Sequence, residues 1–358
     1  MKRLVVNSAI LAVLLVASSA YAVQFSFLDS SYVQEIYTGP FVGGPGMAWT
    51  ASGNFLTRNG SSILEYSPTQ NNIHQGTNFH DVIATHTISG LNSGGYGMVK
   101  GTDGLIYVNT GSGLQRFDPN SWASPATTLA GTTGGGGGYG ITLLSNGKIA
   151  YVAGSGTNEV WVYDPSTNTN SATPIYTAAG LIDDIEGGQS GVIALAGQTL
   201  SQLIVISNSG SPINIFNTGV HYPDGIAFGD GVTNTSIFTN NNDGTITKYT
   251  YGPGYTGTPT TTLIASGYGA YGDLAAVGPD CAFYVYQGEN GNTHGSIAGV
   301  GTHWDNNVAT PEGSVIRIAL KSGVCGFNYQ LETTPEPGSL FGISAGLVGL
   351  VGLIRRKK

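Results

Sequence analysis

The feature that most constrains the fold of this chain is an internal repeat. Six stretches share one order: a small residue, an apolar strand, a turn and a second apolar strand. Their first residues lie 51, 43, 44, 41 and 48 positions apart. They are Gly46, Gly97, Gly140, Asp184, Gly225 and Asp273. A period of about 45 residues with several strands per repeat is typical of β-propeller blades.

The strand pattern supplies four strands for each repeat. Hairpin signals such as Asp103-Gly104 and Asn146-Gly147 join the first two strands, and a third strand with apolar alternation follows each pair. A fourth strand appears five times between repeats. The sixth candidate, residues 33–39, precedes the first repeat and is placed to pair with the last one and close a ring.

We therefore predict an all-β fold, a six-bladed β-propeller with four antiparallel strands per blade, filling residues 23–332. Five or seven blades and a β-sandwich are the competing interpretations. Only 34 of 358 residues carry formal charge and 56 are glycine, which disfavours a helical bundle. The supply of apolar and aromatic residues argues against a disordered chain.

Both ends are predicted to lie outside this domain. Residues 1–22 have the basic start, apolar run and Ala20-Tyr21-Ala22 cleavage site of a secretory signal peptide. At the other end, residues 333–358 combine Pro335-Glu336-Pro337, an apolar stretch from 340 to 354, and a basic end that contains Arg355 and Arg356. The apolar stretch predicts a short transmembrane helix of about 22 Å, and a permanent tail anchor is the alternative.

This tail resembles the PEP-CTERM sorting signal of Gram-negative bacteria. The resemblance implies an exosortase-type enzyme as partner, transient insertion of the tail in the inner membrane, and removal of the tail. The protein would then be membrane-tethered until processing and afterwards lie at the cell surface or outside the cell.

Charge and cysteine content add two expectations for the exported body. Six of the thirteen basic and one of the twenty-one acidic residues lie in the removable ends, so the body keeps a net charge of −13. Such a body disfavours nucleic acid and anionic lipid as partners and suits cations or neutral glycans. Cys281 and Cys325 are the only cysteines, and in an oxidising compartment they are predicted to form a disulfide.

The blades resemble six-bladed propellers of the gluconolactonase/regucalcin and NHL-repeat kind, through phrases such as Tyr222-Pro223-Asp224-Gly225 and Gly278-Pro279-Asp280. The former propellers bind a divalent metal at one channel mouth through Glu, Asn and Asp, and Asp224 and Asp273 fall near two of those positions. The first blade carries Gly44-Pro45-Gly46 where that family has its ligand Glu.

Residues that begin the inner strands should ring one mouth of the central channel. Aligning the repeats puts six residues there, with Asp184 and Asp273 one place later: Pro45, Tyr96, Tyr139, Asp183, Asp224 and Gly272. Carboxylates gathered in this way suit a hard divalent cation, with Ca²⁺ the first candidate, so Asp183, Asp184, Asp224 and Asp273 are the predicted metal ligands. The alternative is that each caps a turn or accepts backbone N–H bonds.

Three aromatic residues are candidate ligand-binding groups: Tyr96, Tyr139 and Trp304, the last in a long Gly- and Asn-rich connection over residues 288–313. Inter-blade packing is the alternative for the two tyrosines. His74, His80 and His86 are interpreted as loop residues.

No complete catalytic set is visible, so a binding or structural role at the cell surface or in an extracellular polysaccharide matrix is favoured over an enzyme. A gluconolactonase-like, divalent-metal-dependent hydrolase acting at the channel mouth is the second hypothesis. A streptogramin-lyase-like propeller is the third.

Overall fold

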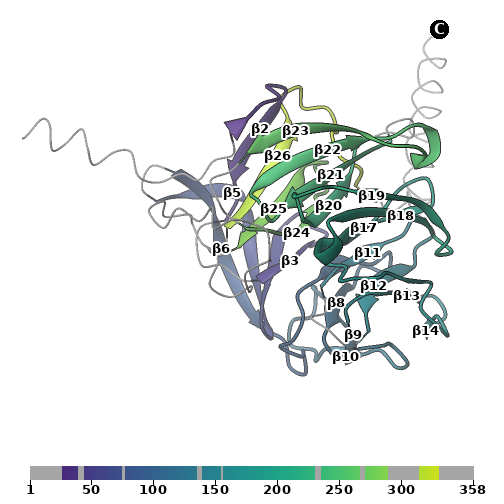
Figure 1. Ribbon diagram of the computed structural model, residues 1–358. Helices are drawn as coiled ribbons and strands as arrows, with labels where there is room; N and C mark the ends of the chain where they lie inside the picture. The colour runs from purple at the N-terminus through teal and green to yellow at the C-terminus, as the bar shows by residue number, and fades with distance from the viewer. Residues whose placement is uncertain are drawn as a thin grey trace, which may run out of the picture.

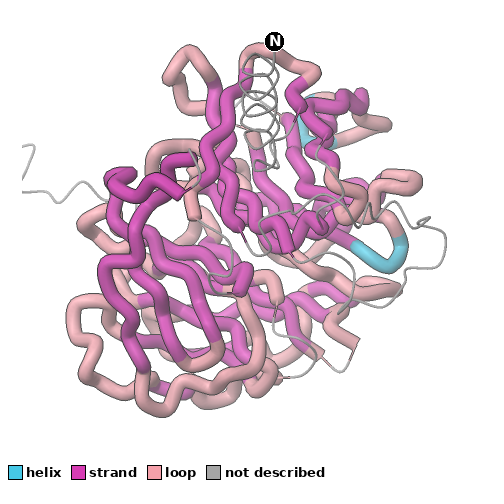
Figure 2. Tube along the Cα trace, turned by 90° about the vertical axis from the view of Figure 1, so that its left-hand side faces the viewer, coloured by secondary structure: helices cyan, strands magenta, loops and turns pink. Residues whose placement is uncertain are grey.

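The computed structural model describes residues 26–38, 44–74, 77–134, 139–154, 156–229, 235–266, 271–288 and 314–329. The predicted signal peptide, the sorting tail and Trp304 lie outside these residues. Within them, no helix has the length and apolar character needed to cross a membrane. Strands and loops make up nearly all of the described chain, with two short 3-10 helices, η1 (Gln198–Leu200) and η2 (Pro253–Tyr255) (Figure 2).

The strands form six antiparallel sheets, one for each predicted repeat. Blades 1 to 3 contain β3 (Gly44–Trp49), β4 (Phe55–Asn59), β5 (Ser62–His74) and β6 (Thr77–Thr87); β7 (Met98–Lys100), β8 (Ile106–Thr110), β9 (Gly113–Phe117) and β10 (Thr127–Thr128); and β11 (Ile141–Leu143), β12 (Ile149–Ala153), β13 (Glu159–Asp164), β14 (Thr169–Asn170) and β15 (Tyr176–Thr177).

Blades 4 to 6 follow in chain order. They contain β16 (Ile185–Gly187), β17 (Val192–Gly197), β18 (Gln202–Ser207) and β19 (Pro212–Asn217); β20 (Pro223–Phe228), β21 (Ser236–Asn241), β22 (Thr245–Thr250) and β23 (Thr260–Ser266), with β1 (Ser26–Phe27) added at the edge; and β24 (Tyr271–Val277), β25 (Phe283–Gly288), β26 (Ser314–Leu320) and β2 (Tyr32–Ile36).

The six inner strands surround a central channel. Each of β3, β7, β11, β16 and β20 contacts the inner strand of the next blade, and β24 contacts β3 (Figure 1). This confirms the six-bladed propeller and excludes the sandwich and the other blade numbers.

The ring is closed by the N-terminal strand, as predicted. β2 pairs with β26 in the register Tyr32↔Leu320 to Ile36↔Ile316, and the purple β2 lies beside the yellow β26 in Figure 1. Glu35 of β2 also reaches blade 1, where its Oε1 lies 2.9 Å from Nε2 of His80. Strand pairing and a side-chain contact therefore join the two ends of the ring.

The apolar core is divided among the interfaces between blades. For example, Leu56 and Ile63 of blade 1 pack with Ile106 and Phe117 of blade 2. Each of the six buried clusters joins two neighbouring blades. This distribution follows from the alternation of apolar residues, because both faces of a blade meet a neighbour.

Blade 1 departs from the prediction at its outer edge. β5 and β6 form a long hairpin, so His74, His80 and His86 are strand residues and not loop residues. His80 is buried, and its ring stacks on Tyr37 at 3.7 Å. The segment is rich in polar residues, which hid its strand character.

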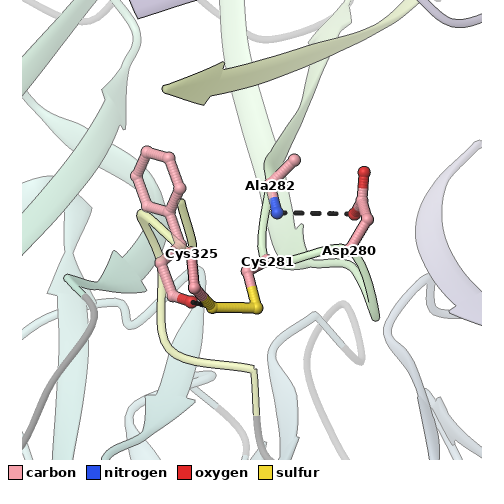
Figure 3. Close-up of a disulfide and its surroundings, with 5 residues drawn as sticks. Asp280, Cys281, Ala282 and Cys325 are labelled. Atoms are coloured by element: carbon pink, nitrogen blue, oxygen red, sulfur yellow. Dashed lines mark hydrogen bonds between the residues drawn. A yellow bond between two sulfur atoms is a disulfide. The ribbon is translucent and has the colours of Figure 1, made fainter. Parts of the chain in front are cut away.

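The predicted disulfide is present between Cys281 and Cys325, with the two Cα atoms 4.9 Å apart (Figure 3). It ties the β24–β25 turn to the segment after β26. Beyond it, Phe327 is buried against Phe238 and Phe283, and Asn328 donates its N–H to the Phe228 carbonyl at 3.0 Å. The disulfide therefore holds the segment of residues 325–328 against blades 5 and 6.

Removing the disulfide should destabilise the propeller. For a sequence separation of 44 residues, the chain-entropy relation gives a loss of about 4 kcal/mol for Cys281→Ala/Cys325→Ala. Guanidinium unfolding of the full chain checks this value. Reductant should lower the midpoint of the unmodified chain and leave the double variant unchanged; equal midpoints for the two chains would contradict the prediction.

Candidate functional site

The described inner strands place six equivalent residues around one end of the channel, which we call the channel mouth. Ile226 of blade 5 and Ala275 of blade 6 both donate their N–H to the Asp184 carboxylate. They therefore occupy equivalent places on their inner strands, and Asp224 and Asp273 each lie two positions earlier. The six residues are Pro45, Tyr96, Tyr139, Asp183, Asp224 and Asp273.

Asp273 takes the place that the repeat alignment gave to Gly272. The pairing of β24 with β25 shifts register between Gly272 and Ala275. Blade 5 has the matching shift between Pro223 and Gly225, so Asp224 and Asp273 occupy the same bulged position of their inner strands. The alignment was therefore wrong at this position, although Asp273 itself was a predicted site residue.

The position after each mouth residue is tightly restricted in space. A Cβ on Gly46 would lie 1.9 Å from the Tyr96 carbonyl oxygen, and one on Gly97 would lie 2.0 Å from that of Tyr139. Only glycine allows the backbones to approach this closely. Blades 3 and 5 also have glycine at this position, whereas blade 4 has Asp184 and blade 6 has Leu274.

Asp184 uses its carboxylate to hold three blades together. Its Oδ1 accepts the N–H of Ile185 at 2.9 Å, and its Oδ2 accepts those of Ile226 at 3.0 Å and Ala275 at 3.2 Å. Burial raises the pKa of this side chain well above its usual range, while the three N–H bonds favour the ionised form. Both oxygens of this predicted metal ligand are thus engaged by backbone donors, the alternative considered for the acidic residues.

The other three carboxyl groups lie close enough to perturb one another. Asp224 is 4% exposed; its Oδ2 accepts from Nε2 of Gln198 at 3.1 Å, and its Oδ1 is buried without a donor among the described residues. Burial, followed by the charge of Asp183 and a hydrogen bond with it, raises the pKa of Asp224 well above its usual range. The two carboxyls are therefore arranged to share a proton.

Asp273 has a similar environment with one compensating bond. Burial and then the charge of Asp183 raise its pKa to about 7, although the Leu274 N–H donates to its Oδ1 at 2.8 Å. Burial and neighbouring charge thus raise the pKa of both Asp224 and Asp273, and the protonated form of each can donate a hydrogen bond as well as accept one.

Two tyrosines complete the mouth opposite blades 4 to 6. The rings of Tyr96 and Tyr139 are stacked at 5.9 Å with an interplanar angle of 21°, and Tyr96 is 41% exposed. Burial, and then the charges of Asp183 and Asp273, raise the pKa of Tyr139 to about 12. The structure therefore brings both predicted tyrosines and three of the four predicted aspartates together.

The sequence did not identify Arg58, whose buried side chain positions a loop at the channel mouth. Its guanidinium is 1% exposed and donates to the carbonyls of Gly60 at 2.9 Å, Gly94 at 2.8 Å and Gly95 at 2.5 Å, and to that of Asn92. Burial lowers its pKa to about 10. These bonds fix the loop that carries Tyr96.

An alignment of the second strands of the blades could have identified Arg58 as a residue that binds backbone carbonyls. Arg58 is equivalent to Asn109 and Asn240, and each asparagine donates to two carbonyls of the next blade. The longer Arg58 side chain reaches four carbonyls instead of two.

The sequence also did not identify a pair formed by His221 and Asp243 at the edge of blade 5. His221 precedes Asp224 by three residues, and its Nδ1 lies 2.7 Å from Oδ2 of Asp243. A hydrogen bond with Asp243 raises the pKa of His221. Asp243 belongs to the β21–β22 turn, and the Asn242 N–H donates to the Tyr222 carbonyl at 3.1 Å, so the pair ties this turn to the start of the inner strand.

The described residues contain no group of three or more His, Cys, Asp or Glu side chains arranged to hold a metal ion. Both oxygens of Asp184 accept backbone N–H bonds, and Asp183 and Asp224 are hydrogen-bonded to each other. Binding of Ca²⁺ to this group stays a prediction.

Comparisons with known proteins bear on the fold. No protein-family model matches the chain, and a search of curated proteins finds no match. Among solved structures, the PQQ-bound aldose sugar dehydrogenase of Streptomyces coelicolor aligns with a TM-score of 0.54 and 12% identity, over 84% of this chain and all of that chain. This likeness in structure supports the propeller fold of this chain.

Two further structures align over similar lengths. U3-55K gives a TM-score of 0.51 at 10% identity, over 82% of this chain and 100% of that one. Streptogramin B lyase gives 0.48 at 12% identity, over 81% and 98%. Since all identities lie near one in ten, the residues of the mouth have to be interpreted from their own chemistry.

The raised pKa of Asp273 predicts how stability depends on pH. Between its usual value of 3.8 and about 7, the folded chain holds a proton that the unfolded chain has lost, so the free energy of unfolding falls as the pH rises. Each such group contributes up to about 1.4 kcal/mol per pH unit. Asp273→Asn should therefore flatten the decline, as measured by urea unfolding between pH 4.5 and 7.5.

Asp164→Asn is the matched control for this experiment. A hydrogen bond from Ser166 lowers the pKa of Asp164 to about 2, so it titrates below the tested range and its removal should keep the original slope. An Asp273→Asn chain with an undiminished slope would contradict the assignment.

Proposed function

We propose that this chain is an exported propeller that binds neutral glycan at the channel mouth, in keeping with a role at the cell surface or in an extracellular polysaccharide matrix. The observation that carries the proposal is the stacked pair Tyr96–Tyr139 beside Asp183, Asp224 and Asp273. Sugar rings offer C–H faces that pack on aromatic rings and hydroxyl groups that both donate and accept hydrogen bonds. The tyrosine rings can pack against the C–H faces, and the carboxyl groups can form hydrogen bonds with the hydroxyl groups.

Charge supports a neutral ligand. The body carries a net charge of −13 once the predicted removable ends are excluded, and the mouth gathers three carboxyl groups. An anionic polysaccharide would be repelled, whereas a neutral one would exchange hydrogen bonds with carboxyls in either protonation state.

Binding to neutral polysaccharide tests this proposal. The purified full chain should bind at least one of dextran, mannan and cello-oligosaccharides and not alginate, as measured by calorimetry at pH 7. Tyr96→Ala removes the exposed stacking surface and should weaken binding at least ten-fold, which corresponds to about 1.4 kcal/mol.

Tyr176→Ala, on the outer strand β15 of blade 3, is the matched control and should leave the affinity unchanged. Equal loss in both variants, or no binding to any neutral glycan, would refute the proposal. The sugar should also be recovered chemically unchanged.

A metal-dependent hydrolase at the same mouth is the second candidate, favoured by the buried Asp224 Oδ1 atom that lacks a donor. Release of product from a lactone with added Ca²⁺, abolished by Asp224→Asn, would replace the binding proposal with this one.

The route to the cell surface is part of the same proposal. Sorting through a PEP-CTERM tail predicts that the exported protein begins at Val23 and lacks the basic end that contains Arg355 and Arg356. Intact-mass measurement of protein recovered from its native cells checks both ends. A mature chain that keeps residues 340–358 would contradict exosortase processing and support the permanent anchor.

A further inference from the structure

The chain leaves the described fold at the end of the channel opposite the mouth. Tyr329, the last described residue, lines the channel with Leu143 and Val277, the final residues of β11 and β24. The mouth residues lie at the beginning of the same strands. The far end is formed by the turns between the first and second strands, which we call the turn face: residues 50–54, 101–105, 144–148, 188–192 and 278–282.

The exit from the fold is held in place by three contacts. Cys325 is bonded to Cys281 of the turn face. Phe327 is 1% exposed and forms a bridge with Gly229, just beyond the end of β20, and Asn328 donates its N–H to the Phe228 carbonyl at 3.0 Å. The segment that follows Tyr329 therefore departs from the turn face.

The predicted membrane segment begins soon after this exit. From Tyr329 to residue 340, where the apolar stretch starts, an extended chain reaches at most about 40 Å. To bring the mouth to the bilayer, this linker would have to pass about 14 Å across the four strands of a blade and about 20 Å along them. That path leaves almost no length for side chains and loops, whereas the turn face can lie at the bilayer directly.

Charged residues are unevenly distributed between the two ends of the strands. Among the described residues, the mouth end has no Lys or Arg apart from the buried Arg58, and its acidic residues are Glu159, Asp183, Asp184, Asp224, Asp243 and Asp273. Protonation neutralises a carboxyl and adds no positive charge, so this end attracts no anion in either form.

The turn end instead mixes both signs of charge. Lys148 Nζ lies 3.1 Å from Oδ2 of Asp164, and Lys321 follows the last residue of β26. Lys321 and Val324 are exposed beside the exit, Val324 at 65%. A lysine and an exposed apolar side chain suit the head-group region of a bilayer that contains anionic lipid.

We propose that the turn face lies against an anionic phospholipid bilayer while the tail is inserted, so that the channel mouth opens away from the membrane. This orientation rests on the tail insertion proposed above and holds for a transient or a permanent anchor. The acidic body as a whole is not drawn to such a surface by charge. The tether keeps it there, and the distribution of charge favours the turn face over the mouth.

Quenching of fluorescent labels by lipid tests the orientation. The full chain is placed in vesicles of phosphatidylcholine and phosphatidylglycerol with nitroxide-labelled head groups. Exposed positions carry the label one at a time: Thr102→Cys and Ser145→Cys on the turn face, with Leu200→Cys and Val220→Cys at the mouth end as matched controls. Because the two ends lie about 20 Å apart, quenching should be at least about three-fold stronger for both turn-face labels.

Flotation of the vesicles separates the orientation from the tether on which it depends. A chain that stays behind when the vesicles float is not tethered, and tether and orientation would both be overturned. A chain that floats with equal quenching at the two ends, or with stronger quenching at the mouth, would overturn the orientation and leave the tether in place. Vesicles of phosphatidylcholine alone should reduce the difference between the ends, and a larger difference there would contradict the role of charge.

Discussion

The architecture of the channel depends on the carboxylate of Asp184. It accepts N–H bonds from the inner strands of blades 4, 5 and 6, through Ile185, Ile226 and Ala275. In blades 1, 2, 3 and 5 the equivalent residue is a glycine, which lets neighbouring backbones approach directly, as at Gly46 and Gly97; blade 6 has Leu274. Blade 4 instead inserts a buried carboxyl side chain that accepts three backbone N–H bonds. An unpaired carboxylate there would be too costly to bury, so these bonds fix the relative positions of three blades.

This interaction also separates the channel into two chemically different parts. The mouth residue Asp183 immediately precedes Asp184, and Glu186, which lies further along the channel, follows it by two positions. The mouth gathers Asp183, Asp224 and Asp273 beside the stacked tyrosines, whereas the wall further along the channel is mostly apolar and includes Lys100, Thr142 and Glu186. Residues 183–187, which comprise β16 and the two residues before it, therefore supply Asp183 to the mouth, Asp184 to the contact between blades 4, 5 and 6, and Glu186 to the channel wall.

Much of this arrangement could be predicted from the sequence, because it follows from local periodicity. The spacing of the repeats gives the blade number, the unpaired strand near residue 33 gives the closure, and the start of each inner strand identifies Tyr96, Tyr139 and the aspartates. The disulfide follows from the two cysteines and the predicted export. These features need only strand alternation and turn chemistry, which a single sequence displays.

The parts that escaped prediction depend on backbone geometry or on contacts between distant segments. The bulges that place Asp224 and Asp273 at matching positions have no residue signature in β20 or β24. Arg58 is satisfied by carbonyl oxygens of residues 92–95, and a sequence does not show where carbonyls point. His80 meets Glu35, 45 residues earlier, only because the ring closes. The role of Asp184 is similar, since two of its three donors come from other blades.

The most direct test of this account is amide hydrogen exchange at Ile226 and Ala275. If the Asp184 carboxylate joins blades 4, 5 and 6, both amides exchange as slowly as the buried strand cores, and Asp184→Ala speeds exchange at both sites while β12, in blade 3, keeps its protection. Exchange at Ile226 and Ala275 that matches exposed loops, or that is unchanged in Asp184→Ala, would contradict the account.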